Sequence, residues 1–263
     1  MAHAGAMAPS DTPRSPSRQL RWQGSRIGIT GARGALGQAL IRRLRARGAH
    51  VVGLSHRDPP QADLIAAPDR VGPQEWVRWD CGQEDALLPL LRDLDVLVLN
   101  HGLNPGADQS TTALNRALEV NALSSWRLLE RFERIAASDA KGRTRRELWV
   151  NTSEAEIQPA LSPAYELSKR LLGQLVSLRW SERRRQPLPN LILRKLVLGP
   201  FRSELNPIGV MSADWVAGQI IMQCDWGLRL VIVTPNPLTY LLMPLSELGR
   251  AAYNRWISNP PDR

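Results

Sequence analysis

Short apolar runs alternate with amphipathic segments along most of this chain. Runs rich in valine, leucine and isoleucine are typical of strands buried on both faces, and the segments between them repeat apolar residues at helical spacing. The predicted strands cover residues 26–30, 50–55, 76–80, 93–100, 147–152, 191–197 and 228–233. This alternation predicts a single α/β domain: a doubly wound, Rossmann-like parallel sheet of about seven strands in a three-layer αβα arrangement.

The pattern weakens in three places. Residues 1–24 contain prolines, serines and arginines without any apolar period, so we expect a disordered leader before a domain of residues 25–263. Residues 58–75 are rich in proline and alanine and are expected to form a loop or a poorly formed helix. After the last strand, residues 238–257 combine an apolar segment with a helix.

Two interpretations of the C-terminal segment remain open. It caps the substrate pocket and a dimer interface, which we favour, or it lies on a membrane surface. On the second interpretation, leucine and aromatic side chains such as Tyr240 and Trp256 insert into the lipid, and Arg250 and Arg255 face the headgroups.

Composition narrows the choice of partner and compartment. The chain has 263 residues, a net charge of +9 and two cysteines, Cys81 and Cys224, which fits a reducing, cytoplasmic environment. Arginines are mixed with glutamates, as in residues 127–134, in the manner of a solvated helix face. We therefore expect no nucleic-acid partner and no metal, and keep acidic small molecules and anionic membranes as partners.

A glycine-rich turn follows the first predicted strand. Gly31, Gly34 and Gly37 lie between that strand and a helical run, which is the context of a dinucleotide-binding turn. Glycines allow the backbone to approach a pyrophosphate, and the following helix N-terminus favours its negative charge. An ordinary glycine turn is the competing interpretation.

The end of the second strand indicates which dinucleotide binds. An acidic residue there would bind the ribose hydroxyls of NAD, but the strand ends with Ser55, His56 and Arg57. Arg33, inside the glycine turn, adds a second cation. Both arginines favour the 2′-phosphate of NADP(H) over NAD(H), although either could be an ordinary surface arginine.

Tyr165 and Lys169 carry the clearest chemical signal. Residues four apart on a helix share a face, so the ammonium is expected to lower the pKa of the phenol and make it a proton donor and acceptor. Lysine is rare here: the chain has only Lys141, Lys169 and Lys195. The alternative is a surface tyrosine and a surface lysine that share a helix by chance.

Together these motifs resemble the short-chain dehydrogenase/reductases over about residues 25–235. The resemblance rests on the glycine turn, the Tyr165–Lys169 pair and five further positions in the family's order: Asp80, Asn100, Gly102, Asn121 and Ser153. It implies that Ser153 binds the substrate oxygen, Tyr165 transfers the proton, Lys169 holds the nicotinamide ribose and tunes Tyr165, and Asn121 supports a proton relay. Asp80, Asn100 and Gly102 would contact the cofactor, as would Gly199 and Ser203 after the sixth strand.

The chain also departs from this family. The G-x-x-G-x-x-G spacing is usual in the extended branch, but the chain lacks that branch's length, so epimerase or dehydratase chemistry is less expected. Gly199 follows a leucine where the family has proline, and Ser203 stands in place of a threonine. Segments around Ser153 and after Gly199 look like a cyanobacterial subgroup, some of whose members carry a sterol-desaturase-like domain, which suggests a lipid-like substrate. Glu154 and Glu156 are either solvated or contact a substrate hydroxyl.

The sequence therefore predicts an NADP(H)-dependent oxidoreductase that interconverts a carbonyl and an alcohol, and a homodimer or larger homo-oligomer. The alternative is a protein that binds NADPH as a sensor or scaffold without turnover. The intact serine, tyrosine and lysine set favours the enzyme.

Overall fold

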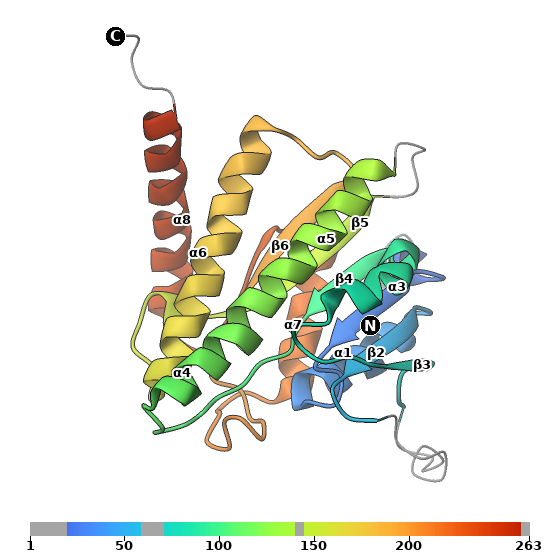
Figure 1. Ribbon diagram of the computed structural model, residues 1–263, viewed down its shortest axis with the longest axis horizontal. Coiled ribbons are helices and arrows are strands. Elements are labelled where there is room, and N and C mark those ends of the chain that lie inside the picture. The colour runs from blue at the N-terminus through green and yellow to red at the C-terminus, as the bar shows by residue number, and fades with distance from the viewer. Residues whose placement is uncertain (1–19, 59–70, 140–144, 259–263) are drawn as a thin grey trace, which may run out of the picture.

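The computed structural model describes residues 20–58, 71–139 and 145–258. Its centre is a sheet of seven parallel strands in the order β3-β2-β1-β4-β5-β6-β7 (Figure 1). The strands are β1 (Arg26–Thr30), β2 (His50–Ser55), β3 (Glu75–Arg78), β4 (Val96–Leu99), β5 (Arg146–Ser153), β6 (Leu191–Leu198) and β7 (Leu230–Val233). The predicted doubly wound α/β fold is confirmed, and the strand order reverses between β1 and β4.

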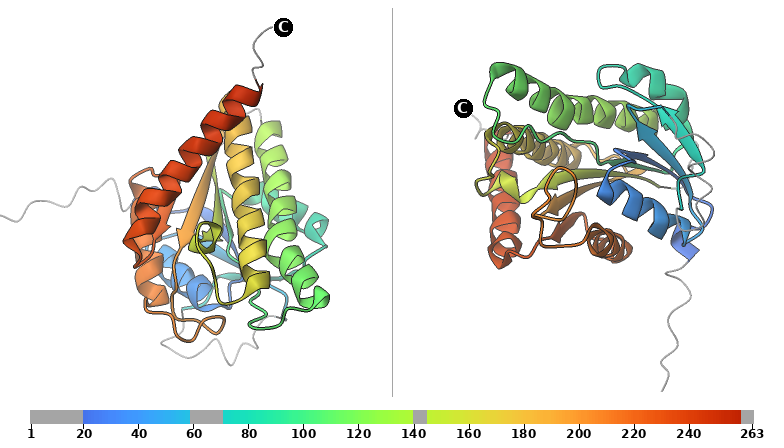
Figure 2. Two further views of the ribbon diagram at one scale, coloured as in Figure 1. Left: turned by 90° about the vertical axis from the view of Figure 1, so that its left-hand side faces the viewer. Right: turned by 90° about the horizontal axis from the view of Figure 1, so that it is seen from below.

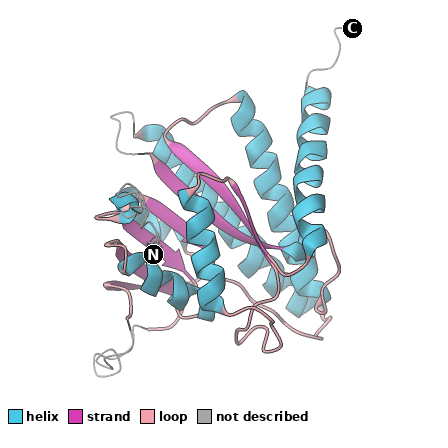
Figure 3. Cartoon of the chain, turned by 180° about the vertical axis from the view of Figure 1, so that it is seen from behind, coloured by secondary structure: helices cyan, strands magenta, loops and turns pink. Residues whose placement is uncertain are grey.

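Helices cover both faces of the sheet (Figures 1 and 3). The α-helices are α1 (Ala35–Arg45), α3 (Leu88–Asp93), α4 (Thr111–Leu118), α5 (Ser124–Ser138), α6 (Pro163–Arg185), α7 (Ala213–Asp225) and α8 (Pro237–Ser258). Short 3₁₀ turns are η2 (Leu20–Trp22), η3 (Glu84–Leu87) and η5 (Glu154–Glu156), and a π-helical turn, η4 (Glu119–Leu123), joins α4 to α5. Helix α8 lies beside α6 on the side away from α5 (Figure 2).

Two apolar cores follow from this layering. The core under α1 and α7 contains Ile29, Leu40 and Ile220, and the core under α3, α5 and α6 contains Leu97, Phe132 and Leu172. Because every central strand is buried on both faces, its residues are apolar without alternation, as the sequence indicated.

The N-terminal boundary differs from the prediction. Residues 20–24 were expected to belong to a disordered leader, but Trp22 is buried and stacks edge-to-face on Trp149 at 5.5 Å. Its indole nitrogen donates to Asp225 at 2.8 Å, and Arg21 pairs with Glu147. These contacts offset the conformational entropy lost when the segment becomes ordered. The folded domain therefore includes residues 20–24.

Other boundaries changed less. The third strand ends at Arg78 and not at Asp80. Residues 112–135, whose apolar residues recur at helical spacing, lie in two helices joined by η4. The apolar segment and helix of residues 238–257 form one continuous helix from Pro237, with Pro244 inside it. The predicted loop of residues 58–75 lies largely outside the described residues.

Candidate active site

The glycine turn is the first part of the site, at the carboxyl end of β1. Gly31 has a φ of +61°, and a Cβ there would lie 2.9 Å from the carbonyl oxygen of Asn100. A Cβ on Gly37 would collide with the carbonyl oxygen of Gly31. Both positions therefore require glycine, because the turn folds tightly on itself and on the end of β4.

The residues of this turn fit a pyrophosphate. Gly34 is the N-cap of α1 and supplies no side-chain cap, and the first turn of α1 contains no acidic residue. Its N–H groups therefore carry positive partial charge at the point where the strand order reverses. These are the features by which a helix N-terminus binds phosphate.

The predicted selectivity residues lie around the end of β2. The Ser55 hydroxyl accepts from the Arg57 N–H at 3.1 Å, and the Arg57 side chain is exposed. The Arg33 guanidinium donates to the carbonyl oxygen of Asp58 and lies 5.3 Å from the centre of the Trp76 ring. Arg33 thus contacts a residue that follows β2, and Arg57 is available to solvent beside the same strand end.

At the end of β4, Thr30 and His101 form a buried polar group. The Thr30 hydroxyl accepts from the Asn100 N–H at 2.8 Å and contacts the His101 ring nitrogen Nδ1 at 2.8 Å. Burial, together with the positive charge of Lys169, lowers the pKa of His101 to about 3. His101 is therefore neutral at physiological pH, and its contact with Thr30 positions this strand end.

A chain of polar contacts joins the glycine turn to the catalytic helix. The Asn100 side chain donates to the Gly31 carbonyl at 3.4 Å and accepts from Asn151 at 2.9 Å. The Asn151 carbonyl in turn accepts from the Lys169 ammonium at 3.0 Å. The turn that fits a pyrophosphate and the lysine predicted to hold the ribose are thus connected through two asparagines.

Ser153, Tyr165 and Lys169 come together as predicted, from β5 and α6. The Ser153 side chain lies close enough to the Tyr165 phenol to lower its pKa, and the Lys169 ammonium lies 5.9 Å from the centre of the Tyr165 ring. Ser162 caps α6 by accepting from the Tyr165 N–H, which fixes the start of the helix one turn before Lys169. This arrangement places a proton donor and an oxygen-binding hydroxyl side by side.

The predicted direction of the Tyr165 pKa is wrong for this arrangement. Burial raises the pKa of the phenol, the Ser153 side chain lowers it, and the nearby charge of Glu154 adds to the rise. Burial also lowers the pKa of Lys169 to about 8, against the attraction of Glu156. Desolvation thus outweighs the effect that the spacing alone predicted for the pair.

Asn121 lies in the π-helical turn η4 and is buried. Its amide donates to the Leu103 carbonyl and to the Ser168 hydroxyl, both at 2.8 Å, and its oxygen accepts from the Leu103 N–H at 2.6 Å. The side chain therefore ties the segment after β4 to the residue that precedes Lys169. The proton relay predicted for Asn121 stays a prediction.

The structure assigns different surroundings to the two glutamates after Ser153. The Glu154 carboxylate accepts from the hydroxyls of Thr234 and Thr239, at the end of β7 and the start of α8. Glu156 is buried against Lys195, whose ammonium donates to it at 2.6 Å. Glu156 is thus neither solvated nor positioned as a substrate ligand, whereas Glu154 lies beside the tyrosine.

The other predicted cofactor residues are more dispersed. Gly102 lies against Asn121, and Gly199 packs so closely on Thr234 that a side chain would collide. The Ser203 hydroxyl accepts from the Asn206 N–H within its own loop, at 3.2 Å. Asp80 follows β3 with a half-exposed side chain, so its contact with an adenine stays a prediction.

Two residues of the site were missed from the sequence. Asn151 links Asn100 to Lys169, and its position as a polar residue near the end of a buried strand was a usable signal. Asn104 donates to the Leu205 carbonyl at 3.1 Å and connects the segments that follow β4 and β6. Because that contact joins two loops that are far apart in the sequence, no local sequence pattern predicted it.

Comparison with known proteins defines the class. Residues 27–171 match the model of the NAD dependent epimerase/dehydratase family. The fold and site are those of a Rossmann-like dinucleotide-binding enzyme, and the chain belongs to the NAD dependent epimerase/dehydratase family. The match assigns the chain to the family of the extended branch, which its length had made less expected.

A curated relative is similar over most of this chain. Monoglucosyldiacylglycerol epimerase of Synechocystis sp. is 42% identical over 236 residues, which cover 90% of this chain and 55% of the relative. The chain thus spans about half the length of that protein. The relative is named as an epimerase, so the narrower resemblance to a subgroup with sterol-desaturase-like domains is not supported.

Solved structures share the fold at low identity. A short-chain dehydrogenase from Sphingobium yanoikuyae in complex with NADPH has a TM-score of 0.71 at 17% identity, covering 91% of this chain and 98% of that one. A short chain dehydrogenase from Burkholderia cenocepacia in complex with NADP has a TM-score of 0.70 at 17% identity, covering 90% and 98%. These likenesses confirm the predicted fold of the short-chain dehydrogenase/reductases.

Proposed function

We propose that this protein is an NADP(H)-dependent epimerase that inverts an alcohol-bearing carbon in the sugar headgroup of a glycolipid. The observation that carries the proposal is the grouping of three side chains: the Lys169 ammonium lies 5.9 Å from the centre of the Tyr165 ring, and Ser153 lies close enough to the phenol to lower its pKa. Membership of an epimerase/dehydratase family and the name of the Synechocystis relative support the reaction and the substrate class. The fold neighbours with bound NADP and NADPH, together with Arg33 and Arg57, support the cofactor.

The residues of the site suit both directions of this reaction. A bound dinucleotide would supply a reversible hydride acceptor, so that removal of a hydride from the alcohol carbon and its return to the opposite face would invert that carbon without net oxidation. Tyr165 accepts the hydroxyl proton as the carbonyl forms and returns it when the alcohol is restored. Ser153 binds the same oxygen in both states, and the Lys169 ammonium stabilises negative charge on the phenol oxygen.

The surroundings hold these groups in place. Asn151 and Asn121 fix the lysine and its helix through the contacts described above. The turn from Gly31 to Gly37 and the start of α1 would hold the pyrophosphate, with Arg33 and Arg57 beside the 2′-phosphate. Glu154, next to the reacting groups, offers a carboxylate to a sugar hydroxyl.

Turnover of a detergent-solubilised monoglucosyl lipid tests the proposal. We expect a stereoisomeric headgroup to accumulate, as measured by analysis of the released sugar, without a stoichiometric change in NADPH absorbance. Tyr165→Phe should lower the rate by about 10²–10⁴-fold because the proton acceptor is lost. Its binding of NADPH, followed by fluorescence, should match that of the parent protein and exceed that of NADH.

Each competing function gives a different result. A carbonyl reductase would consume NADPH in proportion to product. A sensor or scaffold would bind NADPH and release no stereoisomer. Equal rates for Tyr165→Phe and the parent protein would contradict the mechanism.

A further inference from the structure

Helix α8 packs with its polar side chains inward. The residues that face α6 and the sheet recur at helical spacing: Thr239, Met243, Glu247, Arg250 and Asn254. An amphipathic helix on a globular protein normally buries its apolar stripe and exposes its polar one. Beyond Met243, this helix does the reverse.

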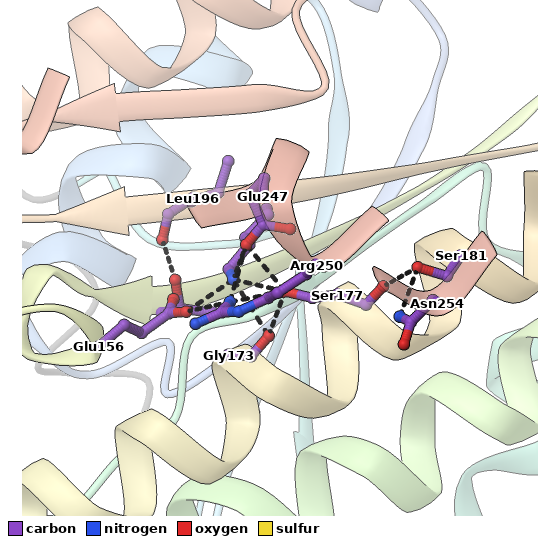
Figure 4. A network of polar contacts seen from close by, with 10 residues as sticks. Glu156, Gly173, Ser177, Ser181, Leu196, Glu247, Arg250 and Asn254 are labelled. Atoms are coloured by element: carbon purple, nitrogen blue, oxygen red, sulfur yellow. Dashed lines mark hydrogen bonds and ion pairs between the residues drawn. The ribbon is translucent and has the colours of Figure 1, made fainter. Parts of the chain in front are cut away.

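Specific polar contacts fix the orientation of α8 (Figure 4). Glu247 accepts from the buried Lys195 ammonium at 2.8 Å, Arg250 donates to Ser177 at 3.0 Å, and Asn254 donates to Ser181 at 3.0 Å. Rotating the helix to bury its leucines would leave the Lys195 charge with one partner fewer in the interior. The outward direction of the apolar residues is therefore determined by the inward contacts.

The outward face of α8 is apolar along its length. Leu241 is 59% exposed and Trp256 is 71% exposed. The same exposed face includes Leu238, Leu242, Leu245, Leu248 and Tyr253. A contiguous apolar surface of this kind marks an interaction site.

Exposed apolar residues also occur in the segments at the carboxyl end of the sheet. Leu161 and Ile208 are 91% and 75% exposed, and Val210 is exposed too. They lie on the segments that follow β5 and β6, and the first turn of α8 follows β7. Because all the strands are parallel, these segments lie at the same end of the sheet as Ser153, the last residue of β5. The starts of α6 and α8 lie at this end of the molecule (Figures 1 and 2).

The far end of α8 carries positive charge. Arg184, Arg185 and Arg255 line a cavity of about 320 Å³ between α6 and α8, and no carboxylate within the described ranges pairs with any of the three. Tyr253 and Trp256 are exposed nearby. Arginine beside tyrosine and tryptophan is the combination found where proteins meet lipid headgroups.

We propose that the outward face of α8, with Leu161 and residues 205–210, binds the surface of a bilayer that contains anionic lipids. The leucines enter the acyl boundary, the three arginines bind headgroup phosphates, and a glycolipid headgroup reaches Tyr165 from the same surface. Among the described residues, none of the helices has the length and apolar character needed to cross a membrane. The glycolipid substrate rests on the proposed function, whereas the bilayer contact does not require turnover.

A second copy of this chain fits the face less well. Glu247 is the only acidic residue of α8, and it faces inward. An interface centred on α8 would therefore bring two sets of arginines together without carboxylates to neutralise them. An anionic lipid surface supplies that negative charge.

Flotation of the full chain with vesicles tests the proposal. We expect binding to vesicles of phosphatidylcholine mixed with phosphatidylglycerol, and weaker binding to phosphatidylcholine alone. Leu241→Glu should weaken binding to both by about tenfold or more, because it places a charge in the acyl boundary. Leu228→Glu, at an exposed leucine before β7, is the matched control and should bind as the parent protein does.

Charge variants test the arginines separately. Arg184→Glu combined with Arg255→Glu should abolish the preference for phosphatidylglycerol, about a thirtyfold effect if each arginine contributes as juxtamembrane cations do. Arg134→Glu, on the exposed side of α5, should leave that preference intact. Circular-dichroism melting of each variant separates loss of binding from loss of folding.

Three results would overturn the proposal: no binding by the parent protein, equal weakening by Leu228→Glu, or conversion of a dimer to a monomer by Leu241→Glu with vesicle binding unchanged. The last result would assign the face to a second copy. Turnover in detergent is measured in parallel. Vesicle binding without turnover would contradict the proposed function and leave the bilayer contact standing. Turnover without vesicle binding would contradict the bilayer contact and leave the proposed function standing.

Discussion

Lys169 is charged in a place that disfavours charge. Its ammonium is buried between the Tyr165 ring and the Asn151 carbonyl, and Glu156 is the acidic group that favours its protonated form. Burial lowers its pKa from 10.5 to about 8. The ammonium therefore persists at neutral pH and loses its proton in mildly alkaline solution, which makes the stability of the protein depend on pH there.

This pKa predicts a stability change in alkaline solution. Between about pH 8 and pH 10.5, the unfolded chain retains a proton on Lys169 that the folded protein has released, so the contribution to the free energy of unfolding rises with pH. The rise amounts to roughly 3 kcal/mol over the full interval and is absent below the folded-state pKa. Urea unfolding of the parent protein and of Lys169→Met at several pH values measures this change. The parent protein should gain stability relative to the variant as the pH rises, because the other titrating groups are common to both proteins and cancel in the difference. Parallel curves for the two proteins would contradict it.

At the residue scale, the sequence predicted what depends on local spacing. Gly31, Gly37, Tyr165 and Lys169 were found because turns and helices place nearby residues together. The pairing of Lys195 with Glu156 was not found, because it joins β6 to η5. The Tyr165 pKa was misjudged because desolvation depends on the whole fold around the ring.

At the scale of elements, helix α6 fits its neighbours through one small residue. A Cβ on Gly173 would overlap the Glu156 carboxylate, which is held by Lys195. Gly249, on the exposed part of α8, has open space around it. Position 173 therefore requires glycine for steric reasons, whereas position 249 has room for a side chain.

Replacing each glycine by alanine should shift stability in opposite directions. Gly173→Ala should lower the free energy of unfolding by about 1 to 3 kcal/mol, because the added methyl displaces a buried ion pair. Gly249→Ala should raise it by about 0.5 to 1 kcal/mol, because alanine loses less backbone entropy in a helix. Chemical denaturation of both variants and the parent measures this. Equal effects would show that the Glu156 contact is not a constraint on α6.

Element prediction was successful for strands and weaker for helices. Buried parallel strands are continuous apolar runs, which end visibly at polar or turn residues. The division of residues 112–135 by η4 leaves the apolar period almost unchanged, so periodicity did not reveal it. The orientation of α8 was also beyond periodicity, because Arg250 faces Ser177 and Glu247, and not headgroups as one interpretation held.

Across the whole molecule, the N-terminal segment ties two layers together. Trp22 stacks on Trp149 of the sheet and donates to Asp225 at the end of α7. Glu147 receives Arg194 at 2.9 Å as well as Arg21; burial opposes ionisation there, but these charges outweigh it and lower the pKa of Glu147. The sequence did not predict this contact, because residues 1–24 have a disordered composition and a single tryptophan shows no period.

Trp22→Ala should therefore destabilise the entire domain. We expect a loss of about 3 to 5 kcal/mol in the free energy of unfolding, the range for truncating a buried aromatic side chain. Trp226→Ala, at a half-exposed tryptophan, should change it by less than about 0.5 kcal/mol. A single cooperative urea transition, shifted to lower concentration only for Trp22→Ala, is the expected result. If Trp22→Ala disordered only the N-terminal segment and left the urea transition unchanged, the proposed link between the sheet and α7 through Trp22 would be contradicted.

The π-helical turn at Asn121 has a consequence for helical phase. One additional residue in a helix rotates everything after it by about 100°. The apolar stripe of α5 contains Leu128, Leu129 and Phe132. Its direction about the helix axis therefore differs by this rotation from the direction that an uninterrupted α-helix continuing α4 would give it. Asn121, which faces Ser168, and the apolar stripe, which faces the core, are set by the same insertion. Deleting one residue between Leu118 and Ser124 would thus have two effects at once. It would rotate Asn121 away from Ser168, and it would rotate the apolar stripe of α5 away from the core.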